Sequence, residues 1–537
     1  PQTILTDVRT EGVDEGHHPN APKPQLKAGD PLNPQLEHED IVALQTYYAD
    51  RGHVEVQVAP RLDVSADKTQ AKLVYSVTEG PHVNVDEVIV RGNTYTDRDV
   101  VLRRSNLDPG DPFSYTSLLE AQRELYRLGI FQRVEIQPEQ SGTTVGDRDV
   151  VIQVEEGKNL TVTGAVGFRA ERGVEGGHGL NVQPRVAAAA AHRNLFGTGR
   201  YLGMEGVFST GRQQEQEAFL TYREPFVSRW DVPVQLQIFQ ADDSTRPETR
   251  IRQRGTSIEL SKFARSRARW SLRYEYKISE CVEGAVCRLV RNDEGEEVPV
   301  ENLDRSLLDI QISSIAPTFF WDTRDDIIDP HRGFFTSAAL EFAFPFIEAD
   351  ANFTKEFIQG AYYFPLSART VIALSSRIGM IQPLGDTSDK DVPLSERFTA
   401  GGETTQRAFP RDLLGTLCSD PLDFEGGDCE QTLFRRVDKE TGEFTGPILP
   451  LGGSGLFLFN AEYRFPIFST LGGALFADAG NVFRTSRIRL GDLRYGLGFG
   501  LRYLSPVGPL RIDIGWPLAR RDYEHPFSYS ISLGYAF

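Results

Sequence analysis

The chain has 537 residues, with 58 basic and 76 acidic residues and a formal net charge of −18. This acidity excludes a general nucleic-acid binder and a basic membrane-surface protein, because no surplus of cations is available for phosphate groups. Hydrophobic residues make up 39% of the chain and glycine is frequent, with 49 residues, so the composition is neither that of a disordered chain nor that of a small disulfide-rich domain.

Residues 1–80 show the first of two mixed α/β patterns. A helix is predicted at Glu39–Ala49, and strands are predicted at Val54–Ala59 and Ala71–Thr78. Residues 1–38 are rich in proline and show no clear pattern. We expect one small α/β domain that ends at the turn sequence Glu79-Gly80-Pro81.

Residues 81–157 repeat this pattern more completely. A strand is predicted at Val83–Arg91, followed by helices at Thr96–Arg104 and Ser114–Leu128. Two alternating strands follow, at Phe131–Gln137 and Asp149–Glu155. The order β-α-α-β-β therefore predicts a second domain of the same kind.

After residue 158, two-residue alternation replaces helical periodicity. In the segment 494–503, aromatic and aliphatic residues occupy one face of the predicted strand, whereas arginine and glycine occupy the other. A soluble sandwich also alternates, but strands of 9–11 residues with aromatic residues at both ends of the apolar face are typical of a lipid-facing barrel. The same pattern recurs in two further segments, 510–516 and 527–537.

The alternation predicts a transmembrane antiparallel β-barrel of 16 strands over residues 158–537. Its connections alternate between short turns and long loops, and an even strand count places both ends of the barrel on the short-turn side. The predicted strand centres are residues 164, 186, 203, 220, 236, 257, 273, 313, 340, 358, 375, 459, 474, 498, 512 and 532.

Four cysteines form two close pairs in polar, loop-like segments, Cys281 with Cys287 and Cys418 with Cys429. Local disulfides in an oxidising compartment are predicted, with free surface thiols as the alternative. No run of residues is suited to a spanning helix, because the longest uncharged run, 444–461, is interrupted by proline and glycine. No signal peptide is visible at Pro1, which fits a mature, trimmed or cytosolic chain.

The two N-terminal repeats resemble the POTRA domain, the periplasmic module of outer-membrane assembly and secretion proteins. The resemblance rests on the sequences VTEGP at 77–81, VRGN at 90–93, YRLGIF at 126–131 and VEEG at 154–157. Five barrel segments resemble marker segments of the BamA/TamA superfamily. They are HRNLFGTGR at 192–200, WDTRDDIIDPHRGF at 321–334, FTAGGETTQRAF at 398–409, FADAG at 476–480 and YLSPVGPLRIDI at 503–514. BamA normally has more than two POTRA domains, so the repeat number suggests either a trimmed chain or one nearer TamA than BamA.

The resemblance implies a lock inside the barrel. In that family the sixth extracellular loop folds into the lumen, and the arginine of a Val-Arg-Gly-Phe-type tetrad meets an acidic residue on the thirteenth strand. The matching positions are Gln406, Arg407, Ala408 and Phe409 on the loop and Asp478 on the strand. Alanine replaces the usual glycine, so the backbone at the loop tip is expected to be strained if φ is positive there. The alternative is an Arg407 that is exposed at a loop tip.

The implied function is an outer-membrane assembly or translocation factor with its POTRA domains in the periplasm. It would capture unfolded clients by strand addition at sheet edges 54–59 and 83–91, the latter including Val83, Val85, Val88 and Val90. Clients would then enter lipid where the first and last barrel strands meet, a seam weakened by glycine. The predicted seam residues are Gly164, Gly167, Gly534 and Phe537.

Two other functions remain open. A two-partner secretion transporter would export a client through the lumen of a similar barrel, although such proteins usually begin with a plug helix. A passive porin, or a catalytic barrel such as a lipase or protease, is the third possibility. The two N-terminal repeats argue against the porin. The absence of HExxH, GxSxG, GxxxxGK[ST] and CxxC motifs argues against the enzyme.

No enzymatic activity, cofactor or metal is therefore expected. The acidic cluster of Asp322, Asp325, Asp326 and Asp329 lacks the spacing of a calcium loop and is interpreted as a solvated periplasmic turn, and His17-His18 is interpreted as a loop pair. The expected partners are unfolded outer-membrane or secreted clients, the lipid bilayer with its lipopolysaccharide, and accessory proteins of the periplasm or inner membrane. Nucleic acid is not expected.

Overall fold

The computed structural model describes most of the chain and divides into two units, which are described separately. Unit 1 contains residues 1–161 and 192–201, and unit 2 contains residues 162–191 and 202–537. The side chains of some further strand residues, Cys281 among them, are also outside the description. The residues not described are 1–2, 13–17, 141–145, 173–179, 210–214, 228–231, 244–248, 266, 285–309, 345–348, 368, 390, 418–431, 438–443, 469, 506–507 and 534–537.

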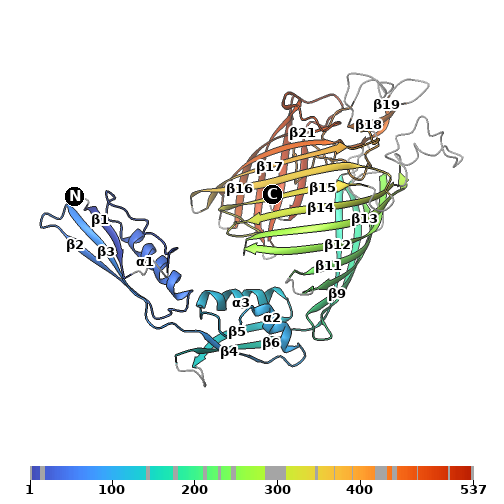
Figure 1. The fold of residues 1–537 in the computed structure, drawn as a ribbon. Helices are drawn as coiled ribbons and strands as arrows, with labels where there is room; N and C mark the ends of the chain where they lie inside the picture. Colours follow the sequence, from blue (N-terminus) through green and yellow to red (C-terminus); the bar gives the residue numbers. More distant parts are fainter. Residues whose placement is uncertain are drawn as a thin grey trace. The chain divides into compact units, whose positions relative to one another are not determined.

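The first repeat is a three-stranded sheet with one long helix lying against it (Figure 1). Its elements are β1 (Ile4–Glu11), α1 (Pro34–Ala49), β2 (Gln57–Val64) and β3 (Gln70–Thr78), in the sheet order β1-β3-β2. β1 is parallel to β3, whereas β2 is antiparallel to it. The core between helix and sheet contains Leu5, Leu26, Leu44, Tyr48, Leu73 and Tyr75.

Two predictions for this repeat were wrong in detail, and one strand was not predicted. The helix begins at Pro34 and not at residue 39, because Asn33 caps it by accepting a hydrogen bond from the Gln35 amide and proline suits the first helical turn. The second strand spans 57–64 and not 54–59. The strand β1 lies within the proline-rich region that showed no pattern.

The second repeat has the same sheet plan. Its elements are β4 (Val85–Arg91), α2 (Arg98–Ser105), α3 (Tyr115–Arg127), β5 (Phe131–Gln140) and β6 (Arg148–Glu156), in the sheet order β4-β6-β5. Again the first strand is parallel to the last, and both helices lie on one face of the sheet (Figure 1). Ser114 caps α3, and a left-handed Asn106 ends α2. In the described part of the chain, no helix is long and apolar enough to cross a membrane.

Unit 1 also contains the turn 192–201, which packs against the second repeat. The amide of Asp97 donates to the Gly197 carbonyl at 2.9 Å, and the Asn194 side chain donates to the Thr96 hydroxyl at 2.8 Å. Tyr95 and Thr96 lie in the loop between β4 and α2 that contacts this turn. Glu156, the last residue of β6, fixes that loop by accepting hydrogen bonds from the amides of both residues. The HRNLFGTGR segment is therefore a docking turn, and Asn194 at its centre is only 1% exposed.

Unit 2 contains a 16-stranded antiparallel sheet, which confirms the predicted barrel; all sixteen predicted strand centres lie within its strands. The strand order runs from β7 to β17 and then from β20 to β24, with β7 and β24 at the two ends. The strands are β7 (Leu160–Arg172), β8 (Leu180–Leu195), β9 (Arg200–Ser209), β10 (Glu215–Glu224), β11 (Val234–Asp243), β12 (Thr249–Arg265), β13 (Ala268–Gly284), β14 (Ile310–Asp322), β15 (Gly333–Ala343), β16 (Phe353–Ser367), β17 (Thr370–Pro383), β20 (Gly455–Pro466), β21 (Leu471–Phe483), β22 (Arg494–Ser505), β23 (Gly508–Leu518) and β24 (Ser528–Leu533).

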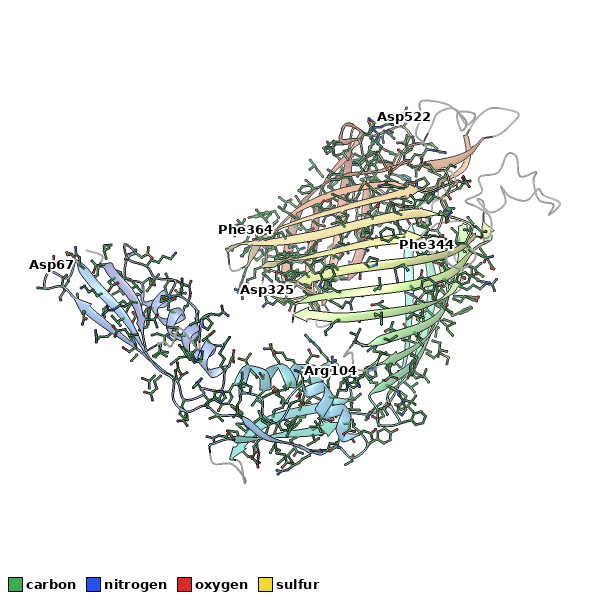
Figure 2. All side chains as sticks on the ribbon, in the orientation of Figure 1. Asp67, Arg104, Asp325, Phe344, Phe364 and Asp522 are labelled. Carbon is green, nitrogen blue, oxygen red and sulfur yellow. The ribbon has the colours of Figure 1, made fainter. Side chains whose placement is uncertain are left out.

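The two faces of the barrel wall differ as the alternation predicted. On β22, Leu497 and Phe499 are 48% and 43% exposed, whereas Arg502 on the opposite face is 3% exposed. Figure 2 shows Asp325 and Phe364 at one end of the barrel, and Phe344 and Asp522 at the other. The outside is therefore an apolar band, and the inside is polar and charged.

Candidate functional site in the barrel lumen

The described parts of the segment 384–454, between β17 and β20, fold back against the inner face of the barrel wall. It carries a small hairpin, β18 (Leu433–Val437) and β19 (Phe444–Pro450). The four residues of the tetrad are all buried, with exposed fractions of 0% for Gln406, 3% for Arg407 and 2% for Ala408 and Phe409. The tip of this loop therefore lies inside the barrel and not at an exposed position.

Arg407 is held by Asp478 of β21 through three hydrogen bonds. The guanidinium donates to the two carboxylate oxygens at 2.7 and 2.9 Å, and the Arg407 backbone amide donates to the same carboxylate at 3.0 Å. Asn460 of β20 donates to Asp478 at 2.9 Å and to the Thr405 carbonyl at 2.6 Å. The arginine is thus gripped bidentately, and the loop backbone is fixed together with it.

The pair belongs to a larger buried cluster that sequence motifs did not reveal. Glu462 of β20 is 1% exposed and contacts Arg407, Arg464 and Arg502. Asp513 of β23 contacts Arg502 at 2.6 Å and Arg511 at 3.1 Å. Four arginines therefore share three carboxylates, namely Arg407, Arg464, Arg502 and Arg511 with Glu462, Asp478 and Asp513.

The strand backbone leaves room for the loop tip through glycine. A Cβ atom on Gly496 would lie 2.4 Å from the Ala408 Cβ, and one on Gly515 would lie 2.9 Å from the Ala408 backbone. The Arg407 guanidinium also stacks on Phe476, 3.7 Å from the ring centroid. Ala408 is not among the described residues with positive φ, so the expected strain from alanine in place of glycine is absent.

A second anchor holds the same loop nearer its start. Glu396 is 3% exposed and contacts Lys277 of β13 at 2.8 Å and Lys355 of β16 at 3.0 Å. Phe398 stacks with Phe357 of β16, with ring centroids 6.0 Å apart. The loop is therefore attached to two separate parts of the barrel wall, through an acidic residue on one side and a basic residue on the other.

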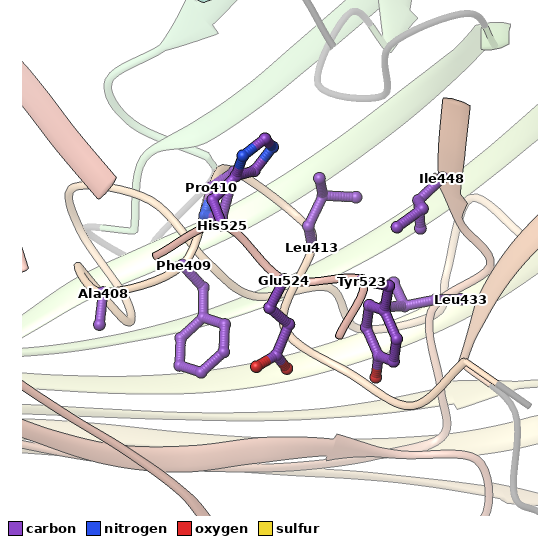
Figure 3. A pocket seen from close by; sticks show the side chains of 9 residues that line it. All are labelled: Ala408, Phe409, Pro410, Leu413, Leu433, Ile448, Tyr523, Glu524 and His525. Atoms are coloured by element: carbon purple, nitrogen blue, oxygen red, sulfur yellow. The ribbon is translucent and has the colours of Figure 1, made fainter. Parts of the chain in front are cut away.

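A small pocket of about 60 Å³ lies beside the tetrad, between the loop and the connection from β23 to β24 (Figure 3). Phe409 and Leu413 line it from the loop, and Tyr523 and Glu524 line it from the connection. Arg521 donates to the Gly415 carbonyl at 3.1 Å and so joins the same two segments. The connection 519–527 is thus a further contact for the folded-back loop.

The predicted edge of the second repeat is only partly available. Val83 precedes β4, and its amide and carbonyl bond to Gly52 and Phe113. The amide and carbonyl of Val85 bond to Asp111 and Gly110, and Arg98 donates to the Val88 carbonyl. The side chains of Val83, Val85 and Val88 are in the domain core, with Val90 packed against it. The interpretation of residues 83–85 as a free edge was therefore wrong.

Other predicted residues have mixed outcomes. Gly164 and Gly167 lie on β7, but Gly534, Phe537 and three of the cysteines fall outside the described residues, as does the side chain of Cys281, so the disulfides stay a prediction. In the turn 323–332, Asp325 and Asp326 accept hydrogen bonds from backbone amides. The hydrogen bonds from the amides of Asp329 and Ile328 lower the pKa of the Asp326 carboxyl group. The carboxylates thus cap the turn, in keeping with its interpretation as a solvated segment.

Comparison with known proteins identifies both parts of the chain. Residues 194–537 match the model of the Omp85 superfamily domain, and residues 23–80 and 83–157 each match the POTRA model, described as a surface antigen variable number repeat. The outer membrane protein assembly factor BamA of Nitratidesulfovibrio vulgaris is 26% identical over 515 residues, covering 93% of this chain and 57% of that protein. A SAM50-like protein of Schizosaccharomyces pombe is 25% identical over 499 residues, covering 86% of this chain and 92% of that protein.

Solved structures share the fold over the whole chain. BamA from Haemophilus ducreyi lacking POTRA domains 1–3 has a TM-score of 0.62 at 17% identity, covering 99% of this chain and all of that one. CdiB from Acinetobacter baumannii has a TM-score of 0.55 at 14% identity, covering 100% and 90%. The chain spans 57% of the length of the N. vulgaris relative. It belongs to the Omp85 superfamily, as an outer-membrane β-barrel whose N-terminal POTRA repeats lie in the periplasm.

Proposed function

We propose that this protein is an assembly or translocation factor that captures unfolded, β-rich clients with its POTRA repeats and inserts them into the outer membrane at the seam of its barrel. Relatives described as outer membrane protein assembly factors support this function. The observation that carries this proposal is the loop that is attached to the barrel wall inside the lumen. Because the loop obstructs passage through the lumen, the terminal strands are the better route for a client into the membrane. The proposed work is mechanical and involves no chemical catalysis.

The proposed partners follow from the same arrangement. Unfolded outer-membrane proteins would be the clients, and the apolar band of the barrel would contact the bilayer and its lipopolysaccharide. Accessory proteins of the periplasm or inner membrane would dock on the repeats.

Capture is best supported at the outer edge of β2. The Ser65 amide donates to the Gln70 carbonyl at 2.9 Å, and the register continues without a bulge through Val64 opposite Ala71. Hydrogen-bonded pairs recur at every second residue of an antiparallel ladder, so the amides of Leu62 and Val64 point away from β3. Pro60 falls on the same outward set, where a missing N–H does not weaken the sheet. This edge offers backbone groups to which a client strand could pair.

A proline at Leu62 tests this edge. Leu62→Pro removes an outward donor and leaves the bonds to β3 intact, whereas Leu62→Ala keeps the donor and shortens the same side chain. Photocrosslinking of the full chain to a urea-denatured outer-membrane β-barrel protein should fall to background in the proline variant and persist in the alanine variant. Equal crosslinking by both variants, with unchanged circular dichroism, would contradict capture at β2.

The seam is supported by the exposure of its outward side chains. Val162 and Val166 of β7 are 74% and 78% exposed, and Ile531 of β24 is 65% exposed, compared with 43% for Phe499 on β22. A Cβ atom on Gly164 or Gly167 would meet no atom of the described residues within 4 Å, so crowding among these residues does not explain glycine there. Glycine weakens strand pairing, and a client strand entering lipid needs partners for its backbone groups.

Locking the seam tests insertion. A disulfide between cysteines placed at Val166 and near Ile531 should abolish client insertion, and reduction should restore it. The matched control is a disulfide between Leu501 and Ile512, which lie opposite each other on β22 and β23 and face outward. Full insertion by a verified crosslinked seam would refute the mechanism and favour export through the lumen, as in a two-partner secretion transporter.

A further inference from the structure

Two histidines and a glutamate meet at one end of the first repeat. His18 lies between β1 and α1, His53 follows α1, and Glu79 follows β3. The His18 Nε2 atom is 3.6 Å from one carboxylate oxygen of Glu79, and the His53 Nε2 atom is 4.0 Å from the other. One ligand atom from each residue lies within 4.8 Å of the other two. Three segments that are distant in sequence therefore bring nitrogen and oxygen ligands together.

These separations suit a shared cation better than direct hydrogen bonds. Protein hydrogen bonds between nitrogen and oxygen span about 2.7–3.2 Å, which is shorter than either distance. Ligand atoms bound tetrahedrally at about 2.0–2.2 Å from one zinc ion lie roughly 3.3–3.6 Å from each other. The two contacts to Glu79 thus need only small side-chain rotations to close around an ion.

Burial and local contacts hold the imidazoles in place. The side chains of His18, His53 and Glu79 are 9%, 14% and 28% exposed. The His53 Nδ1 atom lies 3.3 Å from the Gly80 carbonyl, and a hydrogen bond donated there leaves Nε2 as the free ligand. The His18 ring packs against Tyr48, with centroids 4.8 Å apart, and its buried Nδ1 has no hydrogen-bond partner among the described residues.

We propose that His18, His53 and Glu79 bind one divalent transition-metal ion of the zinc type. Imidazole nitrogen with a carboxylate oxygen selects zinc-like ions over magnesium and calcium, which prefer oxygen ligands. Three protein ligands leave a fourth tetrahedral position for water. The widely spaced ligands match no sequence motif, so His18 was interpreted as half of a loop pair; its neighbour His17 lies outside the described residues.

The bound ion would stiffen the end of the first repeat that adjoins the second repeat. Glu79 begins the linker from β3 to β4, and within this linker the Val83 amide donates to the Gly52 carbonyl beside His53 at 2.9 Å. The Ser114 hydroxyl, which caps α3, donates to Asp50 at 2.7 Å on the same junction. An ion joining His18, His53 and Glu79 would fix the end of the first repeat to which both of these connections are made. This role is independent of client capture and of the barrel seam.

Calorimetric titration of the full chain in detergent micelles tests the site. After treatment with a chelator and its removal, zinc chloride should bind with one ion per chain, and magnesium or calcium chloride should not compete. The variants His18→Gln, His53→Gln and Glu79→Gln should each lose a direct metal ligand. Loss of a group that only orients a ligand lowers metal affinity by roughly 10–100-fold, so each of these variants should bind zinc more weakly than that. His38→Gln, an exposed histidine on α1, is the matched control and should bind as the unaltered chain does.

The outcomes separate this site from other zinc ligands. Reduction followed by alkylation of the four cysteines should leave the zinc binding unchanged, and circular dichroism should show that each variant is folded. Absence of a one-to-one zinc complex in the unaltered chain would overturn the proposal. Full retention of binding in the folded double variant with His53→Gln and Glu79→Gln would also overturn it.

Discussion

The charges of the buried cluster around Arg407 predict how Arg407→Ala, Asp478→Ala and their combination change the stability of the barrel. The unaltered cluster has four arginines and three carboxylates, a surplus of one positive charge. Arg407→Ala leaves three of each, but Asp478 then keeps only the Asn460 amide among its described side-chain partners. Asp478→Ala leaves four arginines with two carboxylates, which doubles the surplus. The double variant returns the surplus to one.

The magnitude follows from burial. The side chains of Arg407 and Asp478 are each 1% exposed, and removing one partner of such a pair costs about 3–5 kcal/mol, because a buried charge is left uncompensated. We therefore expect Asp478→Ala to destabilise the barrel at least as much as Arg407→Ala. The double variant should be no less stable than Asp478→Ala, so that the coupling between the two sites is on the order of one single-substitution effect.

Equilibrium unfolding of the barrel in lipid vesicles measures these free energies, and limited proteolysis of the loop 384–454 reports whether it stays folded inside. Arg369→Ala, an exposed arginine in the short turn before β17, is the matched control and should change stability by less than about 0.5 kcal/mol. If the two single effects simply add in the double variant, within about 0.5 kcal/mol, Arg407 and Asp478 do not act as a pair and the reasoning is refuted.

Three further predictions concern other parts of the chain. Partial burial acts to raise the pKa of Glu156, but hydrogen bonds from Thr94, Thr96 and the amides of the same loop outweigh it and lower this pKa below its ordinary value of 4.5. The stability from Glu156 is therefore fully present above that value and is lost as the pH falls through the lowered pKa, so Glu156→Gln should flatten the acid end of a protease-sensitivity profile of unit 1. Gly197→Ala places a Cβ atom 2.3 Å from the Tyr95 carbonyl oxygen, at a residue with a φ of +75°. This variant should be more sensitive to protease than Gly129→Ala, because Gly129 has a similar φ of +69° but open space around it. Equal protease sensitivity of the two variants would show that the docking contact is unimportant. Mass mapping of a non-reduced digest should find the two local cysteine pairs, and a link between Cys287 and Cys418 would contradict this.

The sequence predicted the barrel well because its signal is local. Alternation along each strand is imposed by a wall with lipid on one side and a polar lumen on the other, so every strand carries its own evidence. The pairing of Arg407 with Asp478 was expected only through family resemblance. Glu462 and Asp513 carry no motif, and their roles depend on which strands lie side by side across the wall. Strand β1 was missed because its partner β3 lies far along the chain, and a parallel pairing leaves no turn signal between them.

The folded-back loop also bears on the permeability of the envelope. A barrel of about 16 strands with an empty interior leaves an aqueous channel, as porins do. Here the lumen is crossed by a segment fixed to β13 and β16 through Glu396 and to β20 and β21 through Arg407. A cell that carries this protein would be shielded from small solutes only while those attachments hold. Substitutions that release the loop would therefore be expected to sensitise the cell to antibiotics that the outer membrane normally keeps out, even where the protein still folds.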